Sequence, residues 1–291
     1  EGAEHFERCA ERALPTENRL PWKLNEAVRY AVLDGGKRVR PLLAYAAGDI
    51  VQAQSEALDH IALALEYIHS YSLVHDDMPC MDNDTLRRGK LTTHRKYGEA
   101  MGMLAGDALQ AQAFFELTQC KLPAEQVVSL VKLLSAAAGA AGMCGGQAVD
   151  LLSVHTKPDL ETLTLMHRMK TGAMIRAAAL MGLYAGQQMP SAMLIGQMTA
   201  YSQAVGLAFQ IIDDILDVTA DTEVLGKTAG KDEADDKPTF VSLLGLEGAR
   251  ARARAEHEVA MQALAAIEEA GFAGKTERLA QIADFIMSRD H

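Results

Sequence analysis

The sequence predicts an all-α protein. Apolar residues recur at helical spacing along nearly the whole chain, and no stretch alternates with period two for long enough to indicate a sheet. Aromatic residues make up only 5% of the 291 residues, whereas Ala, Leu and Met are frequent, which favours helices over strands. No shift in composition marks a linker, so we expect one domain over residues 1–291.

Proline and glycine mark the expected ends of the helices. Residues 25–33 form a helix that ends at Gly35-Gly36, and Pro41 suits the first turn of the next one. A long apolar helix covers residues 58–74 and ends or kinks at Pro79, because proline removes an internal hydrogen bond. Later helical runs begin near three prolines, and the last of these runs covers residues 192–218. The three are Pro123, Pro158 and Pro190.

Two other segments have unusual compositions. Residues 136–146 are rich in small side chains, which lets neighbouring helices approach closely. Residues 221–237 are polar and charged, so we expect a loop there. This loop is either a lid that closes over a site or an ordinary surface loop.

Charge and cysteine usage exclude several classes of function. The net charge of −11 means that the surface as a whole repels nucleic acid and anionic membranes. We find no signal-like start and no uncharged apolar stretch long enough to span a bilayer, so we expect a cytoplasmic protein. The cysteines form no Cys-x-x-Cys pair, which indicates neither a zinc site nor a disulfide framework. They are Cys9, Cys80, Cys120 and Cys144.

Two aspartate-rich segments are the strongest functional signal. The first acidic patch covers residues 76–82 (Asp-Asp-Met-Pro-Cys-Met-Asp) and the second covers residues 213–217 (Asp-Asp-Ile-Leu-Asp). Each lies in or at the end of an apolar helical segment, where several carboxylates are costly unless cations neutralise them. Basic residues interrupt the helical pattern nearby: Lys37, Arg40, Arg87, Arg88, Lys170 and Lys227. Because Mg²⁺ prefers a few carboxylates with phosphate oxygens and water, the combination predicts a metal-bridged phosphate or diphosphate.

Helical geometry places the carboxylates of both patches. Asp213 and Asp217 are four residues apart and share one face of a helix with Gln210, whereas Asp214 points about 100° away. In the first patch His69 lies about two turns before Asp76 on the same face. Asp82 lies beyond Pro79, so it has to return to the metal through a turn.

Other interpretations of these residues are weaker. A calcium loop at residues 82–84 fails because Arg87 stands where an EF-hand requires glycine. The pair His75-Asp76 matches a phosphohydrolase metal dyad, but two-residue matches are common by chance. Glu66-x-x-His69 is half of a di-iron site, and the chain has no second Glu-x-x-His. Each basic residue, taken singly, also fits a solvated surface or a helix end.

At these residues the chain resembles the trans-prenyl diphosphate synthases, most closely the bacterial farnesyl diphosphate synthases, over almost its whole length. Asn83 replaces an aspartate that is common in bacterial relatives, at a position that is not an expected ligand. The segments that carry the resemblance are Gly35-Gly36-Lys37-Arg38-Val39-Arg40-Pro41, Glu66-x-x-His69, the first acidic patch with Leu86-Arg87-Arg88-Gly89, Lys170-Thr171-Gly172, Phe209-Gln210-x-x-Asp213-Asp214-x-x-Asp217 and Gly226-Lys227.

The resemblance implies a large helical bundle of the isoprenoid synthase type with a central cavity. It implies a transferase that condenses isopentenyl diphosphate with dimethylallyl or geranyl diphosphate to give farnesyl diphosphate. It further implies three Mg²⁺ ions, with Mn²⁺ as a possible substitute, and a homodimer. The loop at residues 221–237 would then close to exclude water.

The resemblance also assigns roles to residues. Asp76 and Asp82 would hold two ions with support from Asp150, and Asp213 and Asp217 would hold the third with Asp232 nearby. The diphosphate of the allylic substrate would be held by Arg87, Lys170, Thr171, Gln210 and Lys227. The diphosphate of isopentenyl diphosphate would be held by Lys37, Arg40, His69 and Arg88. The residues expected to carry the chemistry are therefore Asp76, Asp82, Arg87, Lys170, Asp213 and Lys227.

Product length depends on the wall that the growing chain meets. In the family, a bulky aromatic residue at Tyr71, followed by the smaller Ser72 and the insertion Pro79-Cys80, is typical of the bacterial C15 type. We therefore expect Tyr71 to stop growth at farnesyl diphosphate, although buried helical aromatics are often only part of the core.

Four alternatives remain open at this stage. One is the same chemistry with a geranyl or geranylgeranyl product. Another is a terpene cyclase, which has no use for the second diphosphate site formed by Lys37, Arg40 and Arg88. The others are a silent subunit of a heteromeric synthase, which two intact acidic patches disfavour, and a metal-free or di-iron helical bundle.

Overall fold

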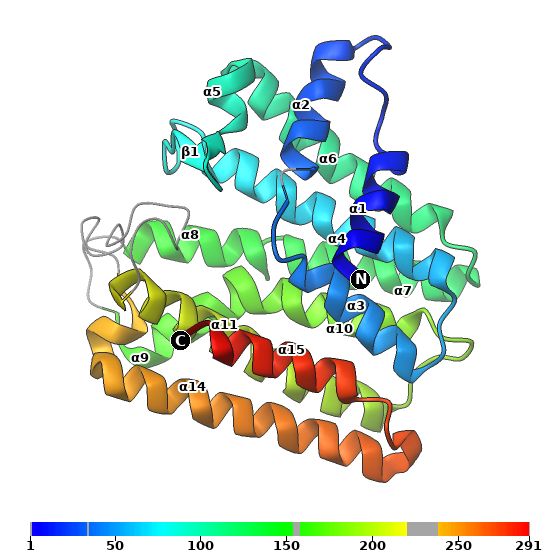
Figure 1. The fold of residues 1–291 in the computed structure, drawn as a ribbon, viewed down its shortest axis with the longest axis vertical. Coiled ribbons are helices and arrows are strands. Elements are labelled where there is room, and N and C mark those ends of the chain that lie inside the picture. Colours follow the sequence, from blue (N-terminus) through cyan, green and yellow to red (C-terminus); the bar gives the residue numbers. More distant parts are fainter. Residues whose placement is uncertain (1, 34, 154–157, 220–237, 291) are drawn as a thin grey trace.

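The computed structural model describes residues 2–33, 35–153, 158–219 and 238–290, and within these ranges the chain is almost wholly helical, as expected (Figure 1). One antiparallel hairpin joins β1 (Leu86–Arg87) to β2 (Lys90–Leu91). The π-helical turns η1 (Arg168–Gly172) and η2 (Glu268–Phe272) and the 3-10 turn η3 (Ser288–Asp290) follow α9, α14 and α15 directly. The α-helices are α1 (Gly2–Ala13), α2 (Trp22–Val32), α3 (Val39–Ile50), α4 (Ser55–Asp76), α5 (Thr93–Tyr97), α6 (Glu99–Gln119), α7 (Ala124–Ala138), α8 (Met143–Ser153), α9 (Leu160–His167), α10 (Ala173–Tyr184), α11 (Ala192–Thr219), α14 (Phe240–Ile267) and α15 (Glu277–Met287).

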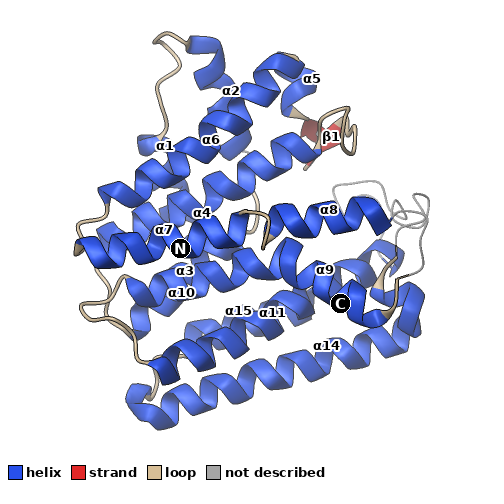
Figure 2. Cartoon of the chain, turned by 180° about the vertical axis from the view of Figure 1, so that it is seen from behind, coloured by secondary structure: helices blue, strands red, loops and turns tan. Residues whose placement is uncertain are grey.

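The two helices that carry the acidic patches are buried on most sides. Helix α4 packs against α3, α6 and α10, and its Ile61, Leu65 and Ile68 are fully buried. Helix α11 packs against α10 and α14, with α15 beside it (Figure 2). A helix that is apolar all round requires neighbours on every side, which explains why these two segments lie inside the bundle. Each acidic patch therefore lies at the C-terminal end of a rigid, buried helix.

Most of the expected helix boundaries are confirmed. Helix α11 ends one residue beyond the expected segment, and α4 ends at Asp76, three residues before Pro79. Pro41 lies in the first turn of α3. The expectation for α2 was wrong at its start, because the helix begins at Trp22, directly after Pro21.

The short hairpin was not predicted. Its strands have two residues each, which is too short to produce a period-two pattern. The turn residues Arg88 and Gly89 have φ angles of 51° and 76°, and two successive positive φ angles are typical of the type I′ turn that favours tight hairpins. The hairpin is the element that separates Arg87 from Arg88.

The small-residue segment at 136–146 has two roles. Gly139 and Gly142 belong to a turn that separates α7 from α8, which the sequence interpretation missed. Gly146 shows the expected close approach, because a Cβ atom added there would lie 2.3 Å from the backbone nitrogen of Lys170. The glycine therefore sets how closely η1 lies against α8.

Among the described residues, one segment, Ala124–Ser153, is long and apolar enough to cross a bilayer when judged by length and composition alone, and an 18-residue stretch of it has a mean hydropathy of 1.7. No such segment was expected from the sequence. The turn at Gly139 divides it into α7 with 15 residues and α8 with 11. Neither helix reaches the roughly 20 residues that a single span needs.

Candidate active site

The first acidic patch returns on itself, as its sequence requires. After α4 ends at Asp76, the backbone N–H of Asp82 donates to the carbonyl of Asp76 at 2.8 Å, and that of Asp84 donates to the carbonyl of Asp77 at 3.1 Å. The turn containing Pro79 thereby brings Asp82 back beside the end of the helix. The two expected metal ligands of this patch lie together.

The cations around Asp76 do not fully compensate the charge of its carboxylate. Its pKa is raised from 3.8 to about 6, mainly because burial disfavours the charged form, and the nearby carboxylate of Asp82 raises it further. The cations of Lys170 and Arg87 lower it but do not restore the ordinary value. A site of clustered carboxylates with a raised pKa fits a divalent cation, because an added positive charge removes the cause of the shift.

Arg87 and Arg88 point to different places. The guanidinium group of Arg87 donates from Nε and Nη2 to both carboxylate oxygens of Asp77, at 2.6 to 3.0 Å. Arg88 donates instead to the carbonyl of Gly35, and its guanidinium group packs against Gly36. The turn thus separates the two side chains as expected.

Arg88 interacts with Arg40 and His69, and we call these three residues, together with Lys37, the basic cluster. The pKa of His69 lies well below 6.5, first because of burial and then because of Arg40 and Arg88, so the imidazole is neutral. The Nε atom of Arg40 is buried without a hydrogen-bond partner among the described residues. A cluster with excess positive charge and an unused donor is suited to an anion.

Glu66, the other half of the possible di-iron motif, is not available as a metal ligand. Its carboxylate accepts from Nη1 of Arg38 at 2.8 Å, and both side chains are almost fully buried. Arg38 also donates to Glu7 and to the carbonyl of Val32. This network anchors the loop before α3, so the di-iron alternative is not supported.

The aspartates of the second acidic patch have different surroundings. Asp214 is buried and accepts from the backbone N–H of Phe240 at 2.8 Å and from Nε2 of Gln210 at 3.1 Å. It therefore anchors the start of α14, which agrees with its expected direction. Asp213 lies on the other face and is paired with Arg289. Asp217, one turn further along α11, is buried.

Arg289 is a residue of the site that the sequence analysis missed. It lies in η3, pairs with Asp213, and its guanidinium carbon lies 4.8 Å from the ring centroid of Phe209. The pKa of Lys37 is lowered, first by desolvation and then by Arg289, whereas Asp213 raises it. Arg289 therefore interacts with both the second patch and Lys37. No local sequence pattern marks a single arginine near the C-terminus.

The π-helical turn η1 bridges the two acidic patches. Lys170 interacts with Asp76 and donates to Asp150 at 2.6 Å. The next residue, Thr171, donates from its hydroxyl to Oε1 of Gln210 at 3.3 Å, on the helix of the second patch. Figures 1 and 2 both show the hairpin and the C-terminal end of α11 on the same side of the molecule, with α8 between them. The two patches are thus linked through η1.

The residues expected to set product length lie on α4, one turn before the first patch. Tyr71 is buried, with its hydroxyl 3.5 Å from Sγ of Cys144 and its ring edge-on to His75 at 5.7 Å. The hydroxyl of Ser72 donates to the carbonyl of His69. Lys227, Asp232 and the possible lid at residues 221–237 lie outside the described residues.

Comparisons with known proteins identify the family of this chain. The family model described as polyprenyl synthetase matches residues 21–271. A probable farnesyl diphosphate synthase of Bradyrhizobium diazoefficiens is 45% identical over 97% of this chain and 84% of its own. The farnesyl diphosphate synthase of Escherichia coli K12 is 43% identical over 99% of this chain and 98% of its own.

Solved structures share the fold. A geranyltransferase from Legionella pneumophila superposes with a TM-score of 0.87 at 34% identity, covering 99% of this chain and 95% of its own. A Helicobacter pylori geranyltransferase complexed with magnesium and isoprenyl diphosphate gives a TM-score of 0.85 at 38% identity, covering 98% and 93%. The all-α architecture is that of the isoprenoid synthases, and the chain belongs to the polyprenyl synthetase family.

Proposed function

We propose that this chain is a farnesyl diphosphate synthase, a transferase that condenses isopentenyl diphosphate with dimethylallyl and then geranyl diphosphate. The observation that carries the proposal is the juxtaposition of two acidic patches, bridged by η1, with a separate basic cluster beside them. A condensing enzyme needs two anion sites with different tasks. A terpene cyclase needs only one, which disfavours that alternative.

We assign the metal ligands to Asp76 and Asp82 in the first patch and Asp213 and Asp217 in the second. All their donor atoms are carboxylate oxygens, which suits three Mg²⁺ ions, with Mn²⁺ as a possible substitute. When bound, these ions supply positive charge that stabilises the departing diphosphate. Arg289 pairs with Asp213 in the structure and would compete with a metal ion for that carboxylate.

We assign binding of the allylic diphosphate to side chains that buried carboxylates hold in place. Arg87 is fixed by Asp77, and Lys170 is fixed by Asp150. Because both cations are positioned before substrate arrives, they stabilise developing negative charge without first reorganising. The same assignment includes Thr171 and Gln210, which join η1 to α11, and Lys227.

The basic cluster of Lys37, Arg40, His69 and Arg88 is assigned to isopentenyl diphosphate. His69 remains neutral, so it donates one N–H without adding to the repulsion among the cations. The double bond of this substrate attacks the allylic cation, and the product loses a proton to the released diphosphate. None of the assigned side chains has to act as the base.

The proposal is tested by incubating the protein with isopentenyl and dimethylallyl diphosphates, with and without EDTA, and separating the products by chain length. We expect a C15 diphosphate that disappears with EDTA and returns with added Mg²⁺. A C10 or C20 main product would replace the farnesyl assignment by geranyl or geranylgeranyl diphosphate synthase. Cyclic products or no condensation at all would reject the proposal.

Two further proposals do not depend on the site: the resemblance implies the first, and features of the sequence predict the second. We expect a homodimer, for which light scattering after size-exclusion chromatography should give twice the mass of one chain. We also expect a cytoplasmic location, which fractionation of the source cells would test.

A further inference from the structure

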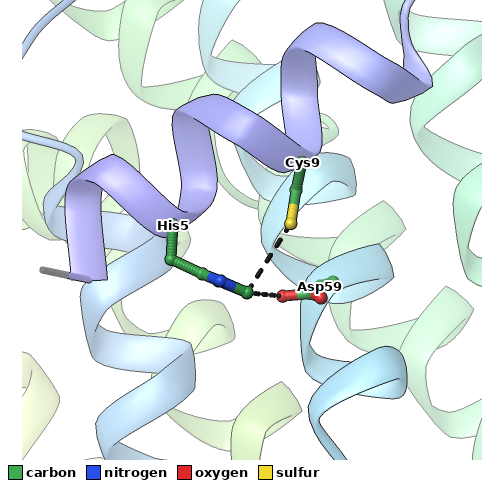
Figure 3. Close-up of side chains that lie close together, drawn as sticks. All are labelled: His5, Cys9 and Asp59. Carbon is green, nitrogen blue, oxygen red and sulfur yellow. Dashed lines mark hydrogen bonds and ion pairs between the residues drawn. The ribbon is translucent and has the colours of Figure 1, made fainter.

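Three side chains of different chemical types, none of them in the acidic patches, lie close together in space. His5 and Cys9 come from α1 and Asp59 comes from α4, and the three point toward one another (Figure 3). The Nε2 atom of His5 lies 2.7 Å from Oδ1 of Asp59 and 3.6 Å from Sγ of Cys9. One donor atom from each residue lies within 4.8 Å of the other two. None of the three residues is assigned to the metal or diphosphate sites, although His5 shares a cavity with Lys37.

The fold brings these residues together for simple reasons. His5 and Cys9 are four positions apart on α1 and therefore share one face of the helix. That face packs against α4, where Asp59 lies in the second turn. Phe6 and Ala10 are fully buried beside the cluster and fix how α1 lies on the bundle. The donor atoms are thus held by packed helices rather than by a loop.

The donor set indicates zinc rather than magnesium. Cysteine sulfur, imidazole nitrogen and carboxylate oxygen are the protein ligands of Zn²⁺, whereas Mg²⁺ prefers oxygen alone. Tetrahedral bonds of about 2.0–2.3 Å put neighbouring donor atoms roughly 3.3–3.8 Å apart. The observed separation of 3.6 Å between Cys9 and His5 lies in this range, and the 2.7 Å contact with Asp59 would lengthen by less than about 1 Å.

We propose that His5, Cys9 and Asp59 form a zinc site that ties α1 to α4. Zn²⁺ would bind Nε2 of His5, a carboxylate oxygen of Asp59 and the sulfur of Cys9, whose thiol proton is released to solvent. In the zinc-bound form, Nε2 of His5 would bind the ion through its lone pair, with the imidazole proton on Nδ1, in place of the hydrogen bond to Asp59.

The surroundings supply an orienting contact and an open coordination position. The hydroxyl of Tyr45 donates to Oδ1 of Asp59 at 2.8 Å, and its ring lies edge-on to His5 at 5.7 Å, so both ligands are held in place. His5 and Tyr45 also line a cavity of about 670 Å³, which admits a water molecule as the fourth ligand. Burial and the Asp59 carboxylate raise the pKa of the Cys9 thiol, and Arg12, 3.6 Å from the sulfur, opposes them in part.

The site is tested with Co²⁺, which replaces zinc and absorbs in the near ultraviolet when a thiolate binds it. The titration uses the full chain with excess Mg²⁺, so that the acidic patches do not take up cobalt. His5→Gln and Cys9→Ser each remove one ligand. The His5→Gln variant still contains the thiol of Cys9. Cys120→Ser is the matched control, because Cys120 is equally buried and its thiol contacts the carbonyl of Ala57 rather than His5 or Asp59.

We expect one Co²⁺ per chain with a thiolate band that Zn²⁺ abolishes. Both ligand variants should lose the band and bind zinc at least on the order of 100-fold more weakly, whereas Cys120→Ser should match the parent. Zinc should also raise the melting temperature of the parent and not of His5→Gln. The proposal is overturned if the parent gives no thiolate band, or if the band survives in His5→Gln.

Discussion

Aspartates of the site serve two different purposes, which their surroundings decide. Asp77 and Asp150 are buried against Arg87 and Lys170 and hold those cations in place. Asp76 has no comparable ion pair with another described residue, and its pKa is raised by burial and by a neighbouring carboxylate. All three are aspartates. Asp77 and Asp150 orient a cationic side chain, whereas Asp76 is available to bind a metal ion.

Tyr71 gives a prediction at the same scale. We expect Tyr71→Ala to extend the product beyond C15, because removing a buried ring above the first patch opens space for a longer chain. Tyr71→Phe keeps the ring and should still give C15. Chromatography of the products distinguishes the two outcomes. If Tyr71→Ala still gave only C15, Tyr71 would be an ordinary core residue.

Arg289 gives a second prediction at the scale of single residues. Because its side chain neutralises Asp213, it competes with a metal ion for that carboxylate. Replacing it with Gln should tighten Mg²⁺ binding to the substrate-free protein by about fivefold, the equivalent of roughly 1 kcal/mol for a partly exposed ion pair. Arg289→Lys retains the charge and serves as the control. Calorimetric titration measures both, and unchanged or weaker Mg²⁺ binding by Arg289→Gln would refute the competition.

At the scale of elements, the contact between α8 and η1 positions Lys170. A methyl group added at Gly146 would collide with the backbone of η1, which cannot move as a flexible side chain can. We expect Gly146→Ala to lower kcat on the order of 100-fold and to destabilise the fold by about 1–3 kcal/mol. Gly196→Ala in α11, where nothing lies within 4 Å, is the matched control and should keep full activity. Equal kcat values for the two variants would contradict this role of Gly146.

The junction of α9, η1 and α14 contains a buried histidine that should make stability depend on pH. The pKa of His167 is lowered from 6.5 to about 4, mainly by burial and further by Lys170. Its ring packs against Phe240, and both ring nitrogens lack partners among the described residues. In the unfolded chain His167 therefore binds a proton more readily than in the folded protein. Its contribution to the free energy of unfolding is fully present above pH 6.5 and is lost as the pH falls toward 4.

The size of this effect is roughly 3 kcal/mol at most. Urea unfolding of the parent and of His167→Gln between pH 7 and pH 4 measures it. We expect the free energy of unfolding of the parent to fall more steeply than that of the variant over this range. Parallel curves would show that His167 does not titrate as described.

For the whole molecule, periodicity was enough to predict the helical fold and both central helices, because a buried helix carries its pattern locally. The separation of Arg87 from Arg88 was also predictable, although the hairpin that causes it was not. Contacts between distant positions left no local signal: Arg289 meets Asp213 across 76 positions. The same holds for the proposed zinc ligands, since cysteine spacing alone gives no hint of Asp59 or His5.

The central claim is that the two acidic patches serve one substrate. The most direct measurement is a crystal structure with Mn²⁺ and a non-reactive allylic diphosphate analogue, with anomalous scattering locating the metal. We predict manganese on Asp76 and on Asp213, bridged by the diphosphate of a single analogue molecule. Manganese confined to one patch, or ions on both patches without a shared diphosphate, would contradict the account.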